Sequence, residues 1–348
     1  MNATPKTVVG VDTAKSVFQL YTVDMETGEV ISMTLKRGQF LIWFANRKPC
    51  LVGMEACGGS QHWARKLQEL GHNVKLMAGK TVKAFVAGNK SDAADARAIW
   101  TAAQQPSVKA VAVKTEEQQA VLALHRVRQQ LVKNRTAQSN EMRGLLAEYG
   151  EVFGLGRLVL NAGLKEALAR LADRLPAMLI DTLREQWDEL NKLDERIARI
   201  EARLQAWLRQ DRSAQAIAQI PGVGLLTATA AVATMGQPTA FRSGREFAAW
   251  LGLVPAHTGS GGKIRLLKIS KRGDIYLRTL LVQGAHAIQR HATVRAGWVQ
   301  ELSKRRPRNV VTVALANKMA RTIWAVLAHG QEYDRAHVSK RPGTATSI

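Results

Sequence analysis

Four acidic residues in the first third of the chain have the spacing of a metal site. Asp12 and Glu55 each end an apolar run, and Asp92 and Asp95 stand three residues apart in an alanine-rich segment. Residues three apart lie on one face of a helix, so both carboxylates can point to one spot. Carboxylate oxygens are the ligands that Mg²⁺ prefers, and two such ions about 4 Å apart can clamp the attacking and leaving oxygens of a phosphodiester displacement. The set predicts two-metal chemistry on nucleic acid.

Each acid also has a simpler interpretation. Asp92, in a first helical turn, can offset the helix dipole, and an acid at the end of a strand is often a turn residue. The four acids together, in the order strand, strand, helix on a basic protein, favour the metal site.

A serine lies among glycines in the segment "HTGSGGKIR", residues 257–265. Gly259, Gly261 and Gly262 let the backbone approach another backbone closely. The hydroxyl of Ser260 is a weak nucleophile unless a base, a metal or positive charge stabilises its alkoxide. A flexible basic loop, a phosphate contact and a nucleophile therefore all stay open from these residues alone. The cations expected to contact phosphates here are Lys263, Arg265, Lys268, Lys271, Arg272 and Arg278.

A second glycine segment, "IPGVG", precedes an apolar helical run. The backbone amides of Gly222 and Gly224 would face outward at a helix N-terminus, as in the helix-hairpin-helix turns that grip a nucleic-acid backbone. A tight entry into the helix is the plainer alternative, and the sequence does not separate the two.

Composition points to a polyanionic partner. The 348 residues include 50 Lys and Arg against 28 Asp and Glu, a formal net charge of +22, while 46% of residues are hydrophobic. The chain should therefore fold as a globular protein with a basic surface and bind nucleic acid largely through phosphates. Residues 263–308 alone hold twelve Lys or Arg and two acids, so the charge is concentrated near Ser260.

Other sequence features predict a cytoplasmic protein. Cys50 and Cys57 fit neither a disulfide framework nor a zinc site. The N-terminus shows no leader, and the apolar run 310–328 is interrupted by charges, so neither a signal peptide nor a membrane partner is expected. We expect the protein to associate with the nucleoid when it binds DNA.

The periodicity of the chain predicts four parts. Residues 1–112 read as three strands followed by helix, strand, helix, strand and helix, which is a mixed α/β domain with Ser91 as an N-cap. Residues 113–212 are helical with coiled-coil-like spacing, which suits an oligomerisation arm or a plain bundle. Residues 213–332 form a mainly helical domain that carries the serine, and 333–348 form a loose tail.

The motifs together resemble a known family, the DEDD transposases of the insertion sequence 110 family, especially its 1111-type branch. The resemblance runs from about residue 7 to about 335. It rests on "GVDTAKSVF", "MEACGG", "NKSDAADARAI", "IPGVG", "FAAWLGLVP", "SGG" and "ISKRGDIYLR" in this order.

The resemblance implies a RuvC-like (RNase-H-like) mixed-sheet domain, a coiled-coil region and a C-terminal transposase domain. It implies that Asp12, Glu55, Asp92 and Asp95 bind Mg²⁺ and that Ser260 is the nucleophile. Many members have a serine just before this one, where this chain has Gly259. The family also implies donor and target double-stranded DNA, a structured noncoding bridge RNA as guide, and a dimer that assembles to a tetramer.

The expected function is thus an RNA-guided DNA recombinase or transposase that cuts and rejoins strands through a phosphoserine intermediate. Two positively charged metal ions near a serine could stabilise both its alkoxide and the leaving 3′-oxygen. One alternative is a RuvC-like junction nuclease in which water attacks. Another is a non-catalytic nucleic-acid-binding protein.

Overall fold

The computed structural model describes residues 7–24, 26–89, 91–261, 263–290 and 297–335. The chain divides into two compact units. The first comprises Met1–Thr115 with Met235–Ala240, and the second comprises Glu116–Thr234 with Phe241–Ile348. The coiled-coil-like segment and the serine-bearing segment thus share the second unit.

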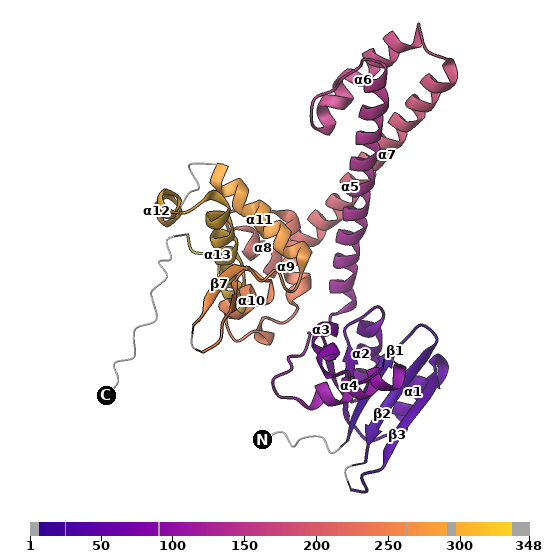
Figure 1. Cartoon of the computed structure of the whole chain (residues 1–348), viewed down its shortest axis with the longest axis vertical. Helices are drawn as coiled ribbons and strands as arrows, with labels where there is room; N and C mark the ends of the chain where they lie inside the picture. The colour runs from indigo at the N-terminus through magenta and orange to yellow at the C-terminus, as the bar shows by residue number, and fades with distance from the viewer. Residues whose placement is uncertain (1–6, 25, 90, 262, 291–296, 336–348) are drawn as a thin grey trace. The chain divides into compact units, whose positions relative to one another are not determined.

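The first unit is built on a five-stranded mixed sheet (Figure 1). Its strands lie in the order β3-β2-β1-β4-β5; the first three are antiparallel, whereas β1, β4 and β5 run parallel. The strands are β1 (Val8–Thr13), β2 (Val17–Val23), β3 (Val30–Lys36), β4 (Leu51–Glu55) and β5 (Asn73–Met77). This confirms the mixed α/β fold and the expected sequence of strands and helices.

Helices cover both faces of this sheet. On one face Phe40 and Phe44 of α1 (Arg37–Ala45) and Trp63 of α2 (Ser60–Glu69) form an aromatic core with Phe18. On the other face lies α4 (Asp92–Gln104), whose Ile99 packs with Val8. Between β5 and α4 the chain forms the short α3 (Gly79–Val82) and a 3₁₀ turn (Lys83–Phe85).

The second unit contains a long helical arm. Helices α5 (Glu116–Glu148) and α7 (Ala177–Gln210) lie side by side, with α6 (Arg157–Ala172) beside them (Figure 1). The expected apolar spacing forms the seam, because Leu183, Leu190 and Leu204 are fully buried in it.

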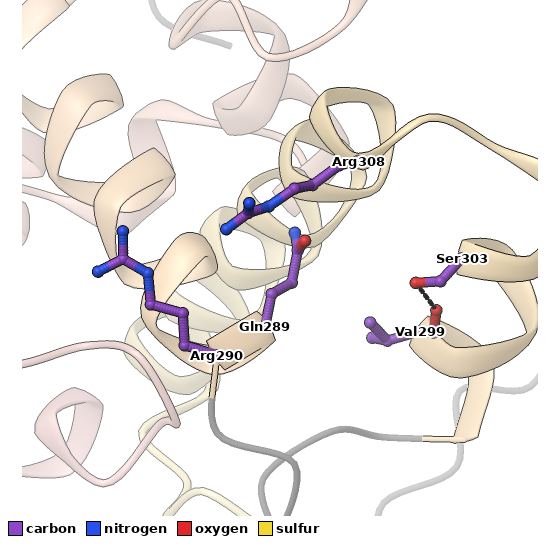
Figure 2. Close-up of a pocket in the computed structure, with 5 residues that line it drawn as sticks. All are labelled: Gln289, Arg290, Val299, Ser303 and Arg308. Atoms are coloured by element: carbon purple, nitrogen blue, oxygen red, sulfur yellow. Dashed lines mark hydrogen bonds between the residues drawn. The ribbon is translucent and has the colours of Figure 1, made fainter.

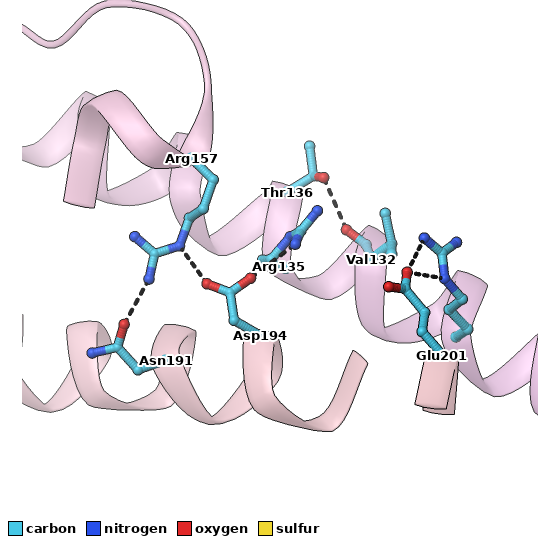
Figure 3. A network of polar contacts seen from close by, with 8 residues as sticks. Val132, Arg135, Thr136, Arg157, Asn191, Asp194 and Glu201 are labelled. Carbon is cyan, nitrogen blue, oxygen red and sulfur yellow. Dashed lines mark hydrogen bonds and ion pairs between the residues drawn. The ribbon is translucent and has the colours of Figure 1, made fainter. Parts of the chain in front are cut away.

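Polar contacts fix the register of the arm. Asp194 of α7 accepts from Arg135 of α5 at 2.8 Å and from Arg157 of α6 at 3.0 Å, so one carboxylate joins three helices (Figure 3). Arg128 and Glu201 form a second bridge between α5 and α7 at 2.6 Å. All these side chains are at least partly shielded from solvent, which makes such pairs more specific than surface pairs.

The rest of the second unit is mainly helical, as expected, with one added hairpin. Its helices pack around α13, which buries Val311, Leu315, Met319 and Ile323. The elements are α8 (Arg212–Ala218), α9 (Leu225–Met235), α10 (Gly244–Trp250), β6 (Pro255–Thr258), β7 (Arg265–Ile269), α11 (Ile275–Arg290), α12 (Gly297–Arg305) and α13 (Arg308–His329). The 3₁₀ turn after α9 (Pro238–Ala240) belongs to the first unit. Most of the expected tail, 333–348, lies outside the described residues.

By length and composition alone, α13 is apolar enough to cross a membrane. Within the described residues it is the one helix that passes this test, and 44% of its most apolar window is buried inside the protein. Core helices of this kind meet the same criteria, and α13 contacts α10, α11 and α12. The expected cytoplasmic location stays a prediction.

Candidate active site

Two glycines let α4 lie directly on the sheet. Gly10 of β1 and Gly53 of β4 are register partners on neighbouring parallel strands. A Cβ at Gly10 would come within 2.6 Å of the Trp100 amide nitrogen, and one at Gly53 within 2.7 Å of the Ala103 Cβ. No side chain fits at either position, so the paired glycines set the distance between helix and sheet.

This packing carries the four acids to one place. Side chains two apart on a strand share a face, so Asp12 lies on the α4 face after Gly10, and Glu55 lies on it after Gly53. On the helix, Asp92 and Asp95 precede Ala96 on the face that packs against the sheet. The first turn of α4 therefore meets the ends of β1 and β4.

Ser91 is the N-cap of α4, so the helix begins at Asp92. Its side-chain oxygen accepts a hydrogen bond from the Ala94 amide at 3.2 Å, which confirms the expected N-cap. Capping fixes which residues form the first turn and hence where the carboxylates of Asp92 and Asp95 project.

Burial and the charges of the other three acids both affect Asp12. Burial raises the pKa of Asp12 above its usual value, and the negative charges of Asp95, Asp92 and Glu55 raise it further. A hydrogen bond from the Thr13 amide acts in the opposite direction. A half-buried carboxyl group among three like charges is a feature of sites that bind cations or carry out chemistry.

Several neighbours of these acids were not predicted from the sequence. A Cβ at Gly79 would lie 2.5 Å from Glu55 Oε1, so the absence of a side chain there leaves room for the carboxylate. Thr13 Oγ1 lies 3.1 Å from Cys57 Sγ and joins the last residue of β1 to the chain just after β4. The position of Thr13 and Cys57 one or two residues beyond Asp12 and Glu55 was the available signal.

The donor set suits a hard divalent cation, because it consists of carboxylate oxygens that repel one another. In the ranges the structure describes, however, no three His, Cys, Asp or Glu side chains approach closely enough to form a coordination shell. The negative charges of the other three acids affect the pKa of Asp12, but the described side chains are not close enough to share one metal ion. A cation bound there would relieve the repulsion that raises the pKa of Asp12.

Ser260 lies in the second unit, at the tip of the β6–β7 hairpin. The strands pair antiparallel, with Thr258 opposite Arg265, and the Lys263 amide donates to the Ser260 carbonyl at 3.2 Å. The serine side chain is exposed. A Cβ at Gly259 would collide with the Lys263 carbonyl, so this loop conformation excludes a serine at that position. The described residues on either side of Gly262 thus belong to a paired hairpin, a feature that the sequence did not predict.

The base of the hairpin is locked by backbone contacts between two motifs. A Cβ at Gly252 in "WLGLVP" would collide with the Arg272 backbone, and one at Gly273 in "SKRGD" would collide with the Trp250 carbonyl. The Lys271 amide donates to the Gly252 carbonyl at 3.1 Å, and Lys271 has a positive φ of 52°. A non-glycine residue with a positive φ stores backbone strain, which is typical of functional segments.

Arg278 differs from the expectation of a phosphate contact. Its side chain is buried, and its Nη1 donates to the carbonyls of Leu251 at 2.9 Å and Arg272 at 2.7 Å. The guanidinium therefore joins the two motifs from inside, because the carbonyls there need a donor. The remaining candidate cations are exposed: Lys263, Arg265, Lys268, Lys271 and Arg272. Gly261 is exposed with a positive φ of 56°, and Gly262 lies outside the described residues.

The "IPGVG" turn connects α8 to α9 and has two different glycines. Gly222 has a positive φ of 80°, and a Cβ there would come within 2.9 Å of the Gly284 carbonyl in α11, so packing alone requires glycine. Gly224 is exposed, with no atom near its missing Cβ. The tight-entry interpretation thus accounts for Gly222, and a phosphate contact remains a prediction for Gly224.

Comparison with known proteins agrees with these motifs. Residues 9–151 match the DEDD transposase family model of the IS110 type, described as "Transposase", and residues 214–299 match the model described as "Transposase IS116/IS110/IS902 family". The first range contains all four acids, and the second contains Ser260 and the hairpin.

Relatives cover nearly the whole chain. A probable family 20 transposase of Pseudomonas aeruginosa is 49% identical over 92% of this chain and 96% of its own length. The transposase for insertion sequence element IS1111A of Coxiella burnetii is 42% identical over 94% of this chain and 91% of its own. The transposase for insertion sequence element IS1328 of Yersinia enterocolitica is 37% identical over 94% and 99%. The chain belongs to the IS110/IS1111 family of insertion-sequence transposases and is a DNA transposase.

Proposed function

We propose that this transposase cuts and rejoins DNA through a covalent link to Ser260, with divalent metal ions, normally two Mg²⁺, held by Asp12, Glu55, Asp92 and Asp95. The observation that carries the proposal is the close packing of α4 on β1 and β4, which places the four acids on one side of the sheet, where three of them add to the effect of burial in raising the pKa of Asp12. Ser260 supplies an exposed hydroxyl at the end of a paired hairpin that also carries cations.

The chemistry is a transesterification. The Ser260 hydroxyl loses its proton as its oxygen attacks the phosphorus, and the bond from phosphorus to the 3′-oxygen breaks. The 3′-oxygen leaves as a hydroxyl after taking up a proton, and the 5′-phosphate stays on the serine. A 3′-hydroxyl of another strand then attacks the phosphoserine and restores both the phosphodiester and the serine. When bound, the metal ions would stabilise negative charge on the attacking and leaving oxygens.

Lys263 and Arg265 follow the serine across the turn and would contact phosphates near the scissile bond. Lys268, Lys271 and Arg272 extend this positive surface, and the exposed Gly224 and Gly261 allow a backbone to approach closely. The acids and the serine belong to different units, so the proposal requires the two units to meet, within one chain or between subunits.

We infer further that the first unit is RuvC-like, because its sheet has three antiparallel strands followed by two parallel ones in the order 3-2-1-4-5. A structured bridge RNA would select the donor and target DNA, which suits a net charge of +22. A dimer that assembles to a tetramer is the assembly that the family resemblance implies.

A covalent adduct assay tests the nucleophile. Incubated with guide RNA, Mg²⁺ and a nicked suicide DNA substrate, the protein should form a protein–DNA adduct that denaturing gels resolve. Ser260→Ala should abolish it, whereas Thr258→Val should retain it, since Thr258 offers an exposed hydroxyl on the same hairpin. An adduct with Ser260→Ala would refute the assignment.

The reaction products distinguish the proposed recombinase from a junction nuclease. A junction nuclease that uses water would give hydrolysed ends and no adduct, with Ser260 only contacting phosphate. RNA that copurifies with the protein, sequenced directly, would test the guide: its loops should match the donor and target DNA. Recombination that proceeds at full rate without RNA would exclude that part of the proposal.

A further inference from the structure

A polar pocket lies in the second unit among the end of α11, the helix α12 and the start of α13. Its volume is about 360 Å³, and Figure 2 shows Gln289 standing between two arginine side chains, with α12 opposite. The residues that line it are Gln289, Arg290, Val299, Ser303 and Arg308. None of them belongs to the serine hairpin or to the acidic site.

In the part of the chain that the structure describes, the two arginines of this pocket lack a counter-charge. Within the described ranges, neither Arg290 nor Arg308 has a carboxylate within 4.0 Å, although other arginines in this unit form ion pairs. Both side chains are exposed. Two guanidinium groups held at one cavity repel each other, so a bound anion would stabilise the arrangement.

The polar groups between the arginines are held in place. Gln289 Nε2 donates to Thr312 Oγ1 at 2.8 Å, and the Thr312 hydroxyl donates to the Arg308 carbonyl at 2.9 Å. Ser303 Oγ donates to the Val299 carbonyl at 2.8 Å. The pocket thus has an ordered floor and wall, with the cationic groups as its free donors.

The first turn of α13 adds to the positive potential. Pro307 is its N-cap, no side chain caps the helix, and the first turn contains no acid. Helix N-termini favour anions through their unpaired amides and dipole, and this helix has 22 residues. This contribution is secondary to the two arginines.

We propose that this pocket binds a phosphate of a nucleic-acid backbone, at a contact separate from the phosphates near Ser260. Arg290 and Arg308 each offer a planar fork of donors that matches phosphate oxygens. The exposed Arg305 and Arg306 continue the positive surface beyond the pocket, which favours a polymer over a free phosphate ion. The inference rests on the proposed function only in taking the ligand of a transposase to be nucleic acid.

The test measures equilibrium binding as a function of salt, in EDTA so that no strand is cut. Arg290→Ala with Arg308→Ala should reduce the slope of log K against log salt by about 0.9 for each duplex phosphate that the variant no longer neutralises, with affinity about three- to tenfold lower near 0.15 M salt. The control, Lys66→Ala with Arg184→Ala, removes the same formal charge from residues already paired with Glu69 and Asp181. It should change neither quantity.

The probes are a DNA duplex and an RNA hairpin of equal length, with inorganic phosphate as competitor. A loss of affinity on DNA alone, on RNA alone or on both supports the site and identifies the source of the phosphate. A loss no larger than in the control, on both probes, overturns it. Because Ser260 and the acids stay intact and no cutting is measured, this result does not depend on the proposed nucleophile.

A second measurement uses the unaltered protein and so remains valid if the double variant folds poorly. Phenylglyoxal modifies exposed arginines, and mass spectrometry locates the sites. Bound DNA or RNA should slow modification of Arg290 and Arg308 at least severalfold, whereas Arg184 should react at its original rate. Equal modification with and without both nucleic acids would also overturn the proposal.

Discussion

The acidic site and the serine hairpin are built in opposite ways. The acids lie where a helix is pressed onto a sheet, and Asp12 is half-buried among charges that raise its pKa. Ser260 is exposed at the tip of two short strands, and the packing of its hairpin is concentrated at the base around Gly252 and Arg278. Packing thus determines the shape of the acidic site, whereas at the hairpin it holds only the base and leaves Ser260 exposed to solvent.

Because of this difference, a substitution should have different effects on stability and activity in the two sites. In the acidic site, the glycines that bring α4 close also hold the sheet and helix together, so a substitution should affect folding and activity at once. At the tip of the hairpin a substitution disturbs little packing, so it should affect activity alone. Four variants with their controls can break or sharpen this contrast, and one pH measurement examines a buried residue outside both sites.

Asp12→Asn should have the largest effect on activity. Loss of one ligand from the proposed metal site should cost several kcal/mol in the transition state, or about 1,000-fold in the rate of DNA strand cleavage. The free energy of unfolding should rise. The pKa of Asp12 is raised in the folded state, so its ionised form destabilises the folded protein at neutral pH, and the neutral asparagine removes this cost. Cleavage rates and thermal unfolding at neutral pH measure both effects. A variant that cleaves normally would remove Asp12 from the site.

Gly10→Ala should damage both folding and cleavage. The added Cβ collides with the backbone of α4, and such overpacking typically costs about 1–3 kcal/mol of unfolding free energy. Displacement of the helix moves Asp92 and Asp95, so cleavage should fall with stability. Gly38→Ala in α1 is the matched control, because nothing lies within 4 Å of its Cβ position and stability there should hold or rise slightly. Urea unfolding distinguishes the two.

Arg278→Ala should reduce stability without changing the salt dependence of DNA binding. The carbonyls of Leu251 and Arg272 would lose their donor, which costs about 1–3 kcal/mol. Lys268→Ala is the contrasting variant: it should leave stability nearly unchanged and reduce the salt slope by about 0.9. If Arg278→Ala changed the slope by as much, its assignment as an internal donor would be incomplete.

Gly259→Ala should affect activity alone. The Cβ collides with the Lys263 carbonyl and forces the loop around Ser260 to change, while the contacts at the base of the hairpin remain. Adduct formation should fall by about tenfold, roughly 1.4 kcal/mol in the barrier, and the unfolding temperature should stay within the error of the wild type. A large drop in that temperature would show that the tip also contributes to the fold.

The smallest effect near neutral pH concerns His125, which lies outside both sites. It is buried between Tyr276 and Thr229, and burial with the nearby Arg128 lowers its pKa from 6.5 to about 4. The unfolded chain therefore binds the proton more tightly, so stability should be full above pH 6.5. It should then fall by at most about 1.4 kcal/mol per pH unit between 6.5 and 4. His125→Asn should flatten this window in urea titrations.

Much of the fold followed from local pattern. The strands and helices of the first unit fall where alternation and helical spacing put them, Ser91 caps α4, and Gly330 ends α13 in the left-handed conformation. The β6–β7 hairpin was not predicted, because its strands are short and nearly all of their residues are exposed, polar and apolar alike, which leaves no alternation to detect.

The candidate sites were predictable to different degrees. Spacing identified Asp12, Glu55, Asp92 and Asp95, but not Gly79 or Cys57, which come near them only through the turns after β4 and β5. Arg278 belongs to a run of cations in the sequence, and only its burial distinguishes it from Lys268. The pocket of Arg290 and Arg308 could not be predicted, because it forms between α11 and α13, which are separated in the chain by α12.

The sequence by itself determined residue chemistry and period: the four acids, the serine among glycines, the positive charge, and the order of strands and helices. The tertiary structure alone decided how close these groups come and which of them face water. The physical reason is that proximity depends on long-range packing, as where Gly10 and Gly53 admit α4, and exposure depends on which neighbour needs a charge, as where two carbonyls draw Arg278 inside.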